Sequence, residues 1–268
     1  VPSQDTKLYQ ESLTGFRKET YNDGSWYEGE FKNGKRHGKG TYVYSNGDRY
    51  VGTFYEGLRH GETVYYCSTG EVFEGAYIHD VREGQGKFYY SANHYIEGTW
   101  KNGLLVYGLE TYEDGSTYEG EYKNGKHHGQ GRFARSDGTT FDGKWDQGNR
   151  LYGTETYPTG NRYEGEYLDN NRHGTGTFYW TTGEVFHGKW VNNLRVHGRE
   201  VCENGDVYEG EFVNDKRQGQ AVYEYKSGGR YEGSYFNGVR HGEGIFYYAN
   251  GSIFKGVWDK GKRIYGIE

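Results

Sequence analysis

Six histidines recur at one position of a repeated pattern, directly before a glycine that follows a short turn. They are His37, His60, His128, His173, His197 and His241. Histidine is the commonest metal ligand, so a row of histidines could form a ladder of metal sites. If each repeat adds two strands to a sheet, however, successive histidines lie about 10 Å apart, too far to share one ion. We therefore expect structural turn residues, with no metal and no cofactor.

Basic residues recur in the same turns and could meet anionic lipid headgroups. The candidates for such contact are Lys35, Arg36, Lys126, Lys216, Arg217, Lys262 and Arg263. A row of glutamates that includes Glu119 and Glu164 runs parallel to these bases. The alternative is therefore that the two rows pair with each other and keep the sheet soluble.

Another set of glutamates occupies what we take to be a glycine position on a face otherwise made of aromatic rings. These are Glu19, Glu110, Glu155, Glu200 and Glu268. An acid on such a face must be paired or near water. An arginine lies five residues before three of these acids, at Arg150, Arg195 and Arg263 for Glu155, Glu200 and Glu268, which favours internal ion pairs across a turn. The alternative is that the acids line an open groove and receive Lys or Arg from a bound helix or peptide.

Aromatic side chains beside charge are what a protein-binding groove needs. The candidates for this groove are Glu110, Tyr112, Tyr118, Tyr122, Trp145, Glu155, Tyr163, Tyr167, Trp190 and Glu200. Catalytic chemistry is not indicated. Glycine-rich strings such as "GKGTY" match fragments of phosphate-binding loops, but those loops need a following helix. No segment has the periodicity of a helix, and no nucleophile elbow or kinase motif set occurs. We expect no catalytic residues and no enzyme.

Composition excludes further classes of partner. The net charge is -6 with both signs interspersed, which gives no reason to expect nucleic acid. No apolar stretch approaches the roughly 18 residues of a membrane-spanning helix. The chain has 30 Tyr and 46 Gly but only 2 Pro, so its core is expected to consist of rings packed on glycine. Met is absent and Val1 comes first, which suggests a fragment of a longer protein.

These residues are positioned by an internal repeat of 22 or 23 residues. Each repeat starts at the first residue of an aromatic-x-Gly triplet, here called its anchor. The anchors are Tyr27, Tyr50, Phe73, Ile96 as the one aliphatic substitute, Tyr118, Phe141, Tyr163, Phe186, Tyr208, Tyr231 and Phe254. Within a repeat, rings and glycines alternate at period two on both sides of a turn, which predicts one β-hairpin per repeat. In the repeats anchored at 96, 141, 186 and 254 the post-turn glycine comes one residue later, so we expect a longer turn there.

The pattern Tyr-x-Gly-x-aromatic, followed after a turn by Gly-x-Gly, closely resembles the MORN repeat (membrane occupation and recognition nexus). The strings "YEGEFKNGKRHGKG" and "YEGEYKNGKHHGQG" carry the resemblance. It implies an all-β fold: an elongated, solenoid-like single-layer array of antiparallel hairpins forming a twisted rod with a groove. We expect residues 27–268 to hold eleven repeats in one continuous array, the last incomplete, after a segment 1–26 that ends a preceding repeat.

The resemblance implies a non-enzymatic scaffold that binds a partner helix or peptide in its groove and organises cytoskeletal or membrane-associated assemblies. We expect it in the cytoplasm, with the cytoskeleton or at the cytoplasmic face of a membrane. Because the last hairpin stops at Glu268, its free strand edge suggests a homodimer through Tyr231, Tyr235, Phe254 and Trp258. Two alternatives stay open: the repeat module of a larger enzyme, such as a SET methyltransferase or a phosphatidylinositol phosphate kinase, or a phospholipid-binding membrane tether.

Overall fold

The computed structural model describes residues 13–268, so the first part of the predicted 1–26 segment, residues 1–12, lies outside the described residues. Between residues 13 and 268 the chain forms 23 β-strands and no helix. The chain divides into two compact units, residues 1–136 and 137–268. The prediction of one continuous array stays a prediction.

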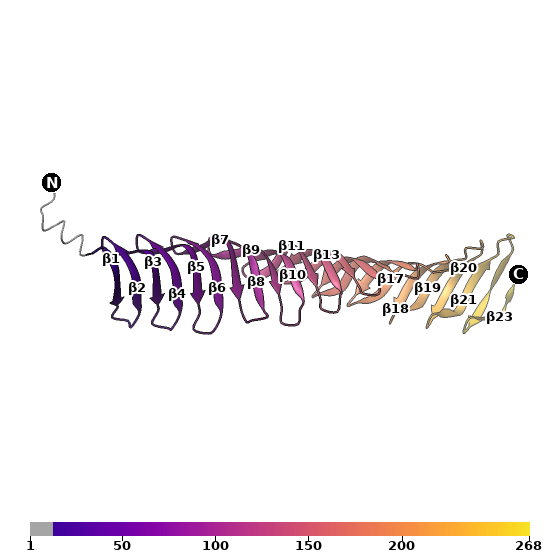
Figure 1. The fold of residues 1–268 in the computed structure, drawn as a ribbon. Helices are drawn as coiled ribbons and strands as arrows, with labels where there is room; N and C mark the ends of the chain where they lie inside the picture. The colour runs from indigo at the N-terminus through magenta and orange to yellow at the C-terminus, as the bar shows by residue number, and fades with distance from the viewer. Residues whose placement is uncertain (1–12) are drawn as a thin grey trace. The chain divides into compact units, whose positions relative to one another are not determined.

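Within residues 13–136 the first unit has eleven strands, most of which are labelled in Figure 1. They are β1 Gly15–Thr20, β2 Trp26–Lys32, β3 Lys35–Val43, β4 Arg49–Tyr55, β5 Leu58–Tyr66, β6 Val72–Ile78, β7 Val81–Tyr89, β8 Tyr95–Lys101, β9 Leu104–Thr111, β10 Thr117–Lys123 and β11 Lys126–Ala134.

The second unit holds the other twelve strands. They are β12 Thr140–Asp146, β13 Asn149–Thr156, β14 Arg162–Leu168, β15 Asn171–Tyr179, β16 Val185–Val191, β17 Leu194–Val201, β18 Val207–Val213, β19 Lys216–Glu224, β20 Arg230–Phe236, β21 Val239–Tyr247, β22 Ile253–Asp259 and β23 Lys262–Ile267.

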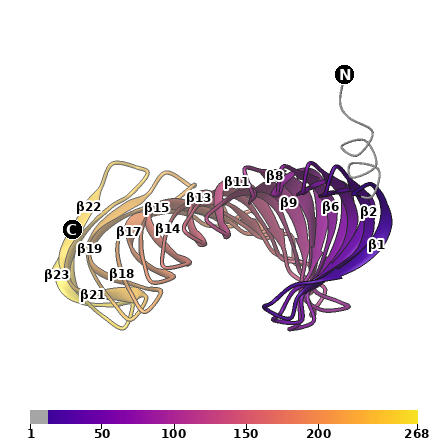
Figure 2. The same cartoon turned by 90° about the vertical axis from the view of Figure 1, so that its left-hand side faces the viewer.

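Each unit is a single-layer meander in which every strand pairs antiparallel with the next along the chain, as β2 does with β3 and β14 with β15. Figure 2 shows the strands of the first unit as a series of curved ribbons. The predicted all-β, single-layer array of antiparallel hairpins is confirmed.

The turns do not differ in length between the two kinds of repeat, so the expected longer turn is wrong. Asn124 and Gly125 form a two-residue turn with φ angles of 52° and 72°. Gln147 and Gly148 form the same turn in the other kind of repeat, with φ angles of 50° and 87°. Two consecutive left-handed residues are the geometry that matches the twist of a hairpin, and Asn-Gly favours it.

The repeats differ instead at a β-bulge after the turn. In β10–β11, Gly120 pairs with Gly131 and Glu121 with His128, which leaves two residues unpaired, the first of them Gly129 at a φ of 58°. In β12–β13, Lys144 pairs with Tyr152 and Trp145 with Arg150, which leaves one. Gly129 is thus a bulge residue. Its left-handed backbone conformation is one that glycine adopts easily.

This bulge moves the glutamates to a different position from the one predicted. Phe133 pairs with the anchor Tyr118, and Glu155 pairs with the anchor Phe141. The glutamates therefore replace the ring opposite the anchor and not a glycine. We call this position the ring slot.

Anchor rings form the core of each unit. Tyr118, Phe141 and Tyr163 are fully buried, and each lies on the glycines of its own hairpin. A Cβ atom added to Gly131 would come within 2.3 Å of the Tyr118 hydroxyl oxygen, so only glycine fits beneath the ring. Anchors also meet the next hairpin: Phe141 packs edge-on against Trp145 of its own strand at 5.2 Å and against Tyr167 of the next hairpin at 5.2 Å between ring centroids. Rings thus join successive hairpins.

Candidate functional site

An arginine stands nine residues after the anchor in most repeats and lies over the buried rings. These are Arg36, Arg59, Arg82, Arg150, Arg172, Arg195, Arg217, Arg240 and Arg263. The guanidinium carbon of Arg82 is 4.5 Å from the centroid of Phe73, and that of Arg150 is 4.7 Å from Phe141. Cation–π contact and burial of the arginine stem stabilise the layer in every such hairpin.

This placement bears on the lipid-headgroup candidates. The guanidiniums of Arg36, Arg217 and Arg263 lie over Tyr42, Tyr208 and Phe254, at 4.7, 4.8 and 4.5 Å from the ring centroids. Lys35 makes an ion pair of 2.7 Å with Glu56.

The remaining lipid candidates, Lys126, Lys216 and Lys262, are exposed. Lipid contact through them stays a prediction.

Glu155 and Glu200 form the internal ion pairs that the spacing favoured. Among the described residues no ion pair joins Arg263 to Glu268, and Arg263 donates to the Tyr248 hydroxyl instead. Arg150 donates from Nη1 to Glu155 Oε1 at 2.8 Å, and both side chains are buried. The hydroxyls of Tyr157 and Tyr167 donate to the other carboxylate oxygen. A buried carboxylate therefore has a guanidinium and two phenols as partners, which compensates for its loss of water.

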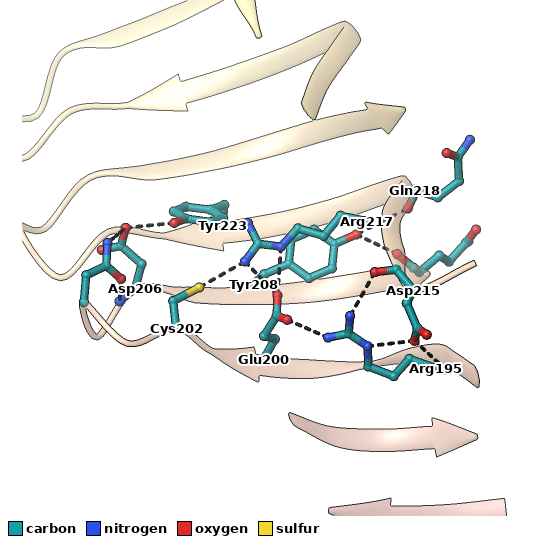
Figure 3. A network of polar contacts seen from close by, with 11 residues as sticks. Arg195, Glu200, Cys202, Asp206, Tyr208, Asp215, Arg217, Gln218 and Tyr223 are labelled. Atoms are coloured by element: carbon teal, nitrogen blue, oxygen red, sulfur yellow. Dashed lines mark hydrogen bonds and ion pairs between the residues drawn. The ribbon is translucent and has the colours of Figure 1, made fainter. Parts of the chain in front are cut away.

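Glu200 is held by two arginines (Figure 3). Nη1 of Arg195 lies 2.7 Å from Oε1 and Nη2 of Arg217 lies 2.7 Å from Oε2. Arg217 also donates to the sulfur of Cys202 at 3.0 Å. Burial lowers the pKa of Arg217, but the neighbouring Glu200 carboxylate outweighs burial and raises it. Arg217 thus keeps its charge inside the layer.

Glu110 has no arginine at either corresponding position, because Leu105 and His127 stand there. Instead its carboxylate accepts from the hydroxyls of Tyr112 and Tyr122 at 2.8 Å each, and His94 Nε2 lies at 2.8 Å.

His127 lies at 3.5 Å from the same carboxylate and stacks on Tyr118 at 3.5 Å between centroids. Burial raises the pKa of Glu110, but these hydrogen bonds outweigh burial and lower it to about 2.

Sequence reasoning missed His94, which lies in the turn between β7 and β8. The sequence contains only an indirect signal for the role of His94. The corresponding turn of the other repeats contains a glycine, as at Gly115 and Gly160, whereas Asn93 replaces it here. Within residues 13–268 no three His, Cys, Asp or Glu residues are arranged to hold a metal ion. The same residues include no helix long and apolar enough to cross a membrane.

The aromatic groove candidates do not line an open surface. Tyr118, Tyr122, Trp145, Tyr163, Tyr167 and Trp190 are all buried, as are Glu110, Glu155 and Glu200. Only Tyr112 is partly exposed, at a pocket of about 540 Å³ that His94 also lines. A single-layer sheet has no second layer to cover its rings, so they pack on the chain's own glycines and arginines. The prediction of an open aromatic groove at these residues is therefore wrong for this structure of the chain.

The four dimer candidates are also buried: Tyr231, Tyr235, Phe254 and Trp258 belong to the ring layer of the second unit. In this structure, a second copy of the chain would contact the side chains around these four residues and not the buried rings themselves. The homodimer itself stays a prediction.

An open groove lies on the opposite face of the sheet in each unit, and we call it the glycine-floored groove. In the first unit it has a volume of about 1220 Å³, with Gly75, Gly86, Gly98 and Gly108 in its lining. Val51, Val64 and Leu109 line it with apolar surface. In the second unit a groove of about 1060 Å³ is lined by Gly233, Gly244 and Gly256 together with Val222, Ile245 and Val257.

The groove of the first unit is acidic. Glu62, Glu74 and Glu97 line it, with Lys87 as the basic residue. Lys87 is paired with Glu97 at 2.7 Å. Among residues 13–268, no basic side chain lies within 4.0 Å of the Glu62 or Glu74 carboxylate. The groove therefore combines apolar surface with carboxylates that lack a cationic partner in this part of the chain.

The repeats define the class of protein. The MORN repeat model matches residues 27–49, 50–72, 73–94, 97–117, 118–140, 152–162, 163–185, 186–207, 208–230 and 231–253. These matches cover most of the 268 residues, so the chain belongs to the MORN repeat family. A comparison with curated proteins found no match.

Solved structures resemble the chain only distantly. The TCP10 domain of Danio rerio CPAP is 12% identical, with 85% of this chain and 99% of that chain covered and a TM-score of 0.33. The TCP10c domain of Drosophila melanogaster Sas-4 is 14% identical, with coverages of 74% and 100% and a TM-score of 0.25. At these TM-scores, neither likeness bears on function.

Proposed function

We propose that the chain is a non-enzymatic scaffold that holds a partner polypeptide in its glycine-floored groove. The observation that carries the proposal is the groove of the first unit, about 1220 Å³ in volume and lined by apolar side chains, glycine backbone and two carboxylates, Glu62 and Glu74, that form no ion pair with the described residues. Concave surfaces with an apolar lining and few polar groups are the usual binding sites of proteins. The ion-paired ring slots, by contrast, are buried and serve to hold the layer together.

The groove runs across several hairpins, so a partner bound in it contacts several strands. Strands lie about 4.8 Å apart, so a segment that crosses six strands has contacts over roughly 24 Å. This arrangement suits an extended protein segment better than a small metabolite. Because the hairpins are held by rings, arginines and glycines on the other face, the groove side chains can vary without loss of the fold.

The test is a substitution that fills the groove. Val64 lines it and is half-buried, so Val64→Arg places a long cation there. Ser45→Arg, at an exposed turn of the same unit, is the matched control. Proteins that bind purified wild-type chain, once identified and purified, are expected to bind Ser45→Arg equally and Val64→Arg at least tenfold more weakly. Equal binding of all three chains would refute the groove as the binding site.

This proposal has three finer parts: a homodimer, association with the cytoskeleton, and contact with anionic phospholipid. Cytoskeletal association follows from the resemblance to MORN proteins, and lipid contact follows from that resemblance and from the bases at Lys126, Lys216 and Lys262. A scaffold in the cytoplasm, at the cytoskeleton or at a membrane surface, would use such contacts to fix its place. Binding to phosphatidylserine vesicles that fades with salt would support the lipid part, and absence of binding at low salt would remove it.

A further inference from the structure

Two neighbouring hairpins lack the arginine that lies over the rings in the other hairpins. The residue nine positions after the anchor is Leu105 in the hairpin of β8 and β9, and His127 in the hairpin of β10 and β11. In the hairpin of β14 and β15 this position holds Arg172, whose guanidinium carbon is 5.4 Å from the ring centroid of Phe178. Phe133 corresponds to Phe178, since each pairs with the anchor of its hairpin, and it lacks this arginine.

An open pocket of about 540 Å³ lies beside these two hairpins, and we call it the turn pocket. It is lined by His94, Tyr112, Glu113, Asp114, Ser116 and Phe133. The rings of His94, Tyr112 and Phe133 form a row, with centroids 5.3 and 6.1 Å apart. The turn pocket therefore combines an aromatic wall with two carboxylates.

These two carboxylates have hydrogen-bond partners but no cation. Glu113 accepts from the Ser91 hydroxyl at 3.0 Å. Asp114 accepts from the N–H and the hydroxyl of Ser116, at 2.9 and 3.0 Å. In the part of the chain that the structure describes, neither acid forms an ion pair. Both acids are exposed, so a cation can reach them from solvent.

A third carboxylate lies behind the aromatic wall. Glu110 is 8% exposed, and its carboxylate lies 2.8 Å from His94 Nε2 and from the Tyr112 hydroxyl. Burial raises the pKa of Glu110, but the hydrogen bonds outweigh burial and lower it to about 2, so the group is ionised at neutral pH. Because an ionised carboxylate only accepts hydrogen bonds, Nε2 of His94 carries the proton and the imidazole needs no second one. Glu110 thus adds negative charge to the turn pocket.

A ring beside a carboxylate is the setting in which this chain places its own guanidiniums. The guanidinium carbon of Arg150 is 4.7 Å from the centroid of Phe141, and Nη1 lies 2.8 Å from Glu155. A planar guanidinium stacks on a ring and donates paired hydrogen bonds to a carboxylate, whereas the compact ammonium of lysine is more strongly hydrated. The turn pocket offers the same combination, but from the surface.

Three arginines of the chain stand near the turn pocket in the sequence. Arg82 lies over Phe73, at 4.5 Å from its centroid. Arg132 precedes a ring-slot residue and so points to the opposite face of the sheet. Arg135 follows in the next turn and is exposed, and within residues 13–268 it forms no ion pair or ring contact. Arg135 is therefore the internal competitor that an experiment has to separate from an external ligand.

We propose that the turn pocket binds the guanidinium of an arginine side chain from a partner polypeptide, which lies over Tyr112 and Phe133 and pairs with Glu113 and Asp114. Residues 91–93 and 113–115 are exposed, so the side chain can enter while its backbone stays outside. The turn pocket shares no lining residue with the glycine-floored groove. The proposal therefore stands or falls independently of the function proposed above.

The test is a titration of the full chain, labelled with ¹³C-histidine, with N-acetyl-arginine N-methylamide. The NMR signal of His94, assigned by its loss in His94→Gln, is expected to shift to saturation. For one side chain the dissociation constant should be on the order of 1 mM. The citrulline compound has nearly the same shape without the charge and should give no shift. The lysine compound should bind at least threefold more weakly.

Variants locate the binding. Glu113→Gln/Asp114→Asn keeps the shape of the pocket without its exposed charge and should weaken binding at least fivefold, and Phe133→Leu should weaken it by a similar factor. The matched control is Glu184→Gln/Glu203→Gln, which removes two carboxylates from turns of the second unit and should bind as wild type. Circular dichroism checks that each variant is folded.

Three outcomes would overturn the proposal. The arginine compound could leave the His94 signal unmoved, bind no better than the citrulline compound, or bind the double acid variant as well as wild type. Binding to Arg135→Gln but not to wild type would make Arg135 of this chain the occupant. Tighter binding of free L-arginine than of the capped compound would make a free amino acid the ligand in place of a partner polypeptide.

Discussion

Removal of one arginine should open a single hairpin of the second unit. Arg150 is 6% exposed and lies 2.8 Å from the carboxylate of Glu155, which is 7% exposed. The substitution Arg150→Leu leaves that carboxylate buried without its guanidinium. Such a loss costs about 3 to 5 kcal/mol. Leucine is chosen because Leu105 already stands at this position in the hairpin of β8 and β9, so its shape is compatible with the layer.

The measurement is hydrogen exchange by mass spectrometry. Because stability in repeat proteins is a sum of local terms, the loss should appear in peptides that cover β13 and β14 and less in peptides that cover β20 and β21. A change of 3 kcal/mol corresponds to exchange faster by about 100-fold, at about 1.4 kcal/mol for each factor of ten.

A second substitution distinguishes the loss of the ion pair from a general destabilisation of the ring layer. Phe178 fills the ring slot of the hairpin of β14 and β15. The double variant Arg150→Leu/Glu155→Phe therefore replaces the ion pair with the phenylalanine that the neighbouring hairpin has in its ring slot. Replacement of a buried pair by apolar groups is often neutral, so the double variant should exchange within about tenfold of wild type. If the single variant exchanges at the wild-type rate, or if the double variant is no better than the single, the reasoning fails.

Three further predictions follow from the layer and its edges. The pKa of Glu110 is lowered to about 2 in the folded chain, below the ordinary carboxyl value, so its stabilisation is present above about pH 4.5 and is lost as the pH falls toward 2. Hydrogen exchange of β9 and β10 should accelerate over that range, and Glu110→Gln should flatten the dependence; an equal slope in both chains would contradict the assignment. Gly176→Ala would place a Cβ atom 2.2 Å from the Tyr163 hydroxyl oxygen and should lower stability by about 1 to 3 kcal/mol in thermal melts, whereas an unchanged melt would show that the ring can move. The homodimer predicts a sedimenting species of twice 30.9 kDa, and a monomer at every concentration would exclude it.

The fold was predictable because its main signal is strong and periodic. Anchors such as Tyr118 and Tyr163 recur with the glycines that lie beneath them, and this pattern fits a strand and not a helix. The bulge was not predictable by the same means. Gly129 and Gly131 look alike in the sequence, yet Gly129 has a φ of 58° and only Gly131 pairs across the hairpin. Alignment on the first of them put the glutamates in the wrong position.

The candidate site was predicted in part. The ion pairs of Glu155 and Glu200 follow from their spacing to arginine, and the structure confirms them. The location of the groove could not be predicted, because the sequence shows which residues share a face but not which face stays open. The partners of Glu110 were hidden for another reason. His94 comes from a neighbouring hairpin, and a contact made by a residue of one turn alone leaves no periodic trace.

The ring contacts between successive hairpins have a consequence for how such a protein can change in evolution. Phe141 packs on Tyr167 of the next hairpin, and Tyr163 packs on Trp190 in the same way. Since these joints within the second unit are alike, a gene duplication or deletion that adds or removes one whole hairpin there creates no unfamiliar contact. It only moves everything beyond it by about 10 Å. Within a unit, repeat number therefore sets the length of the sheet in fixed steps of one hairpin.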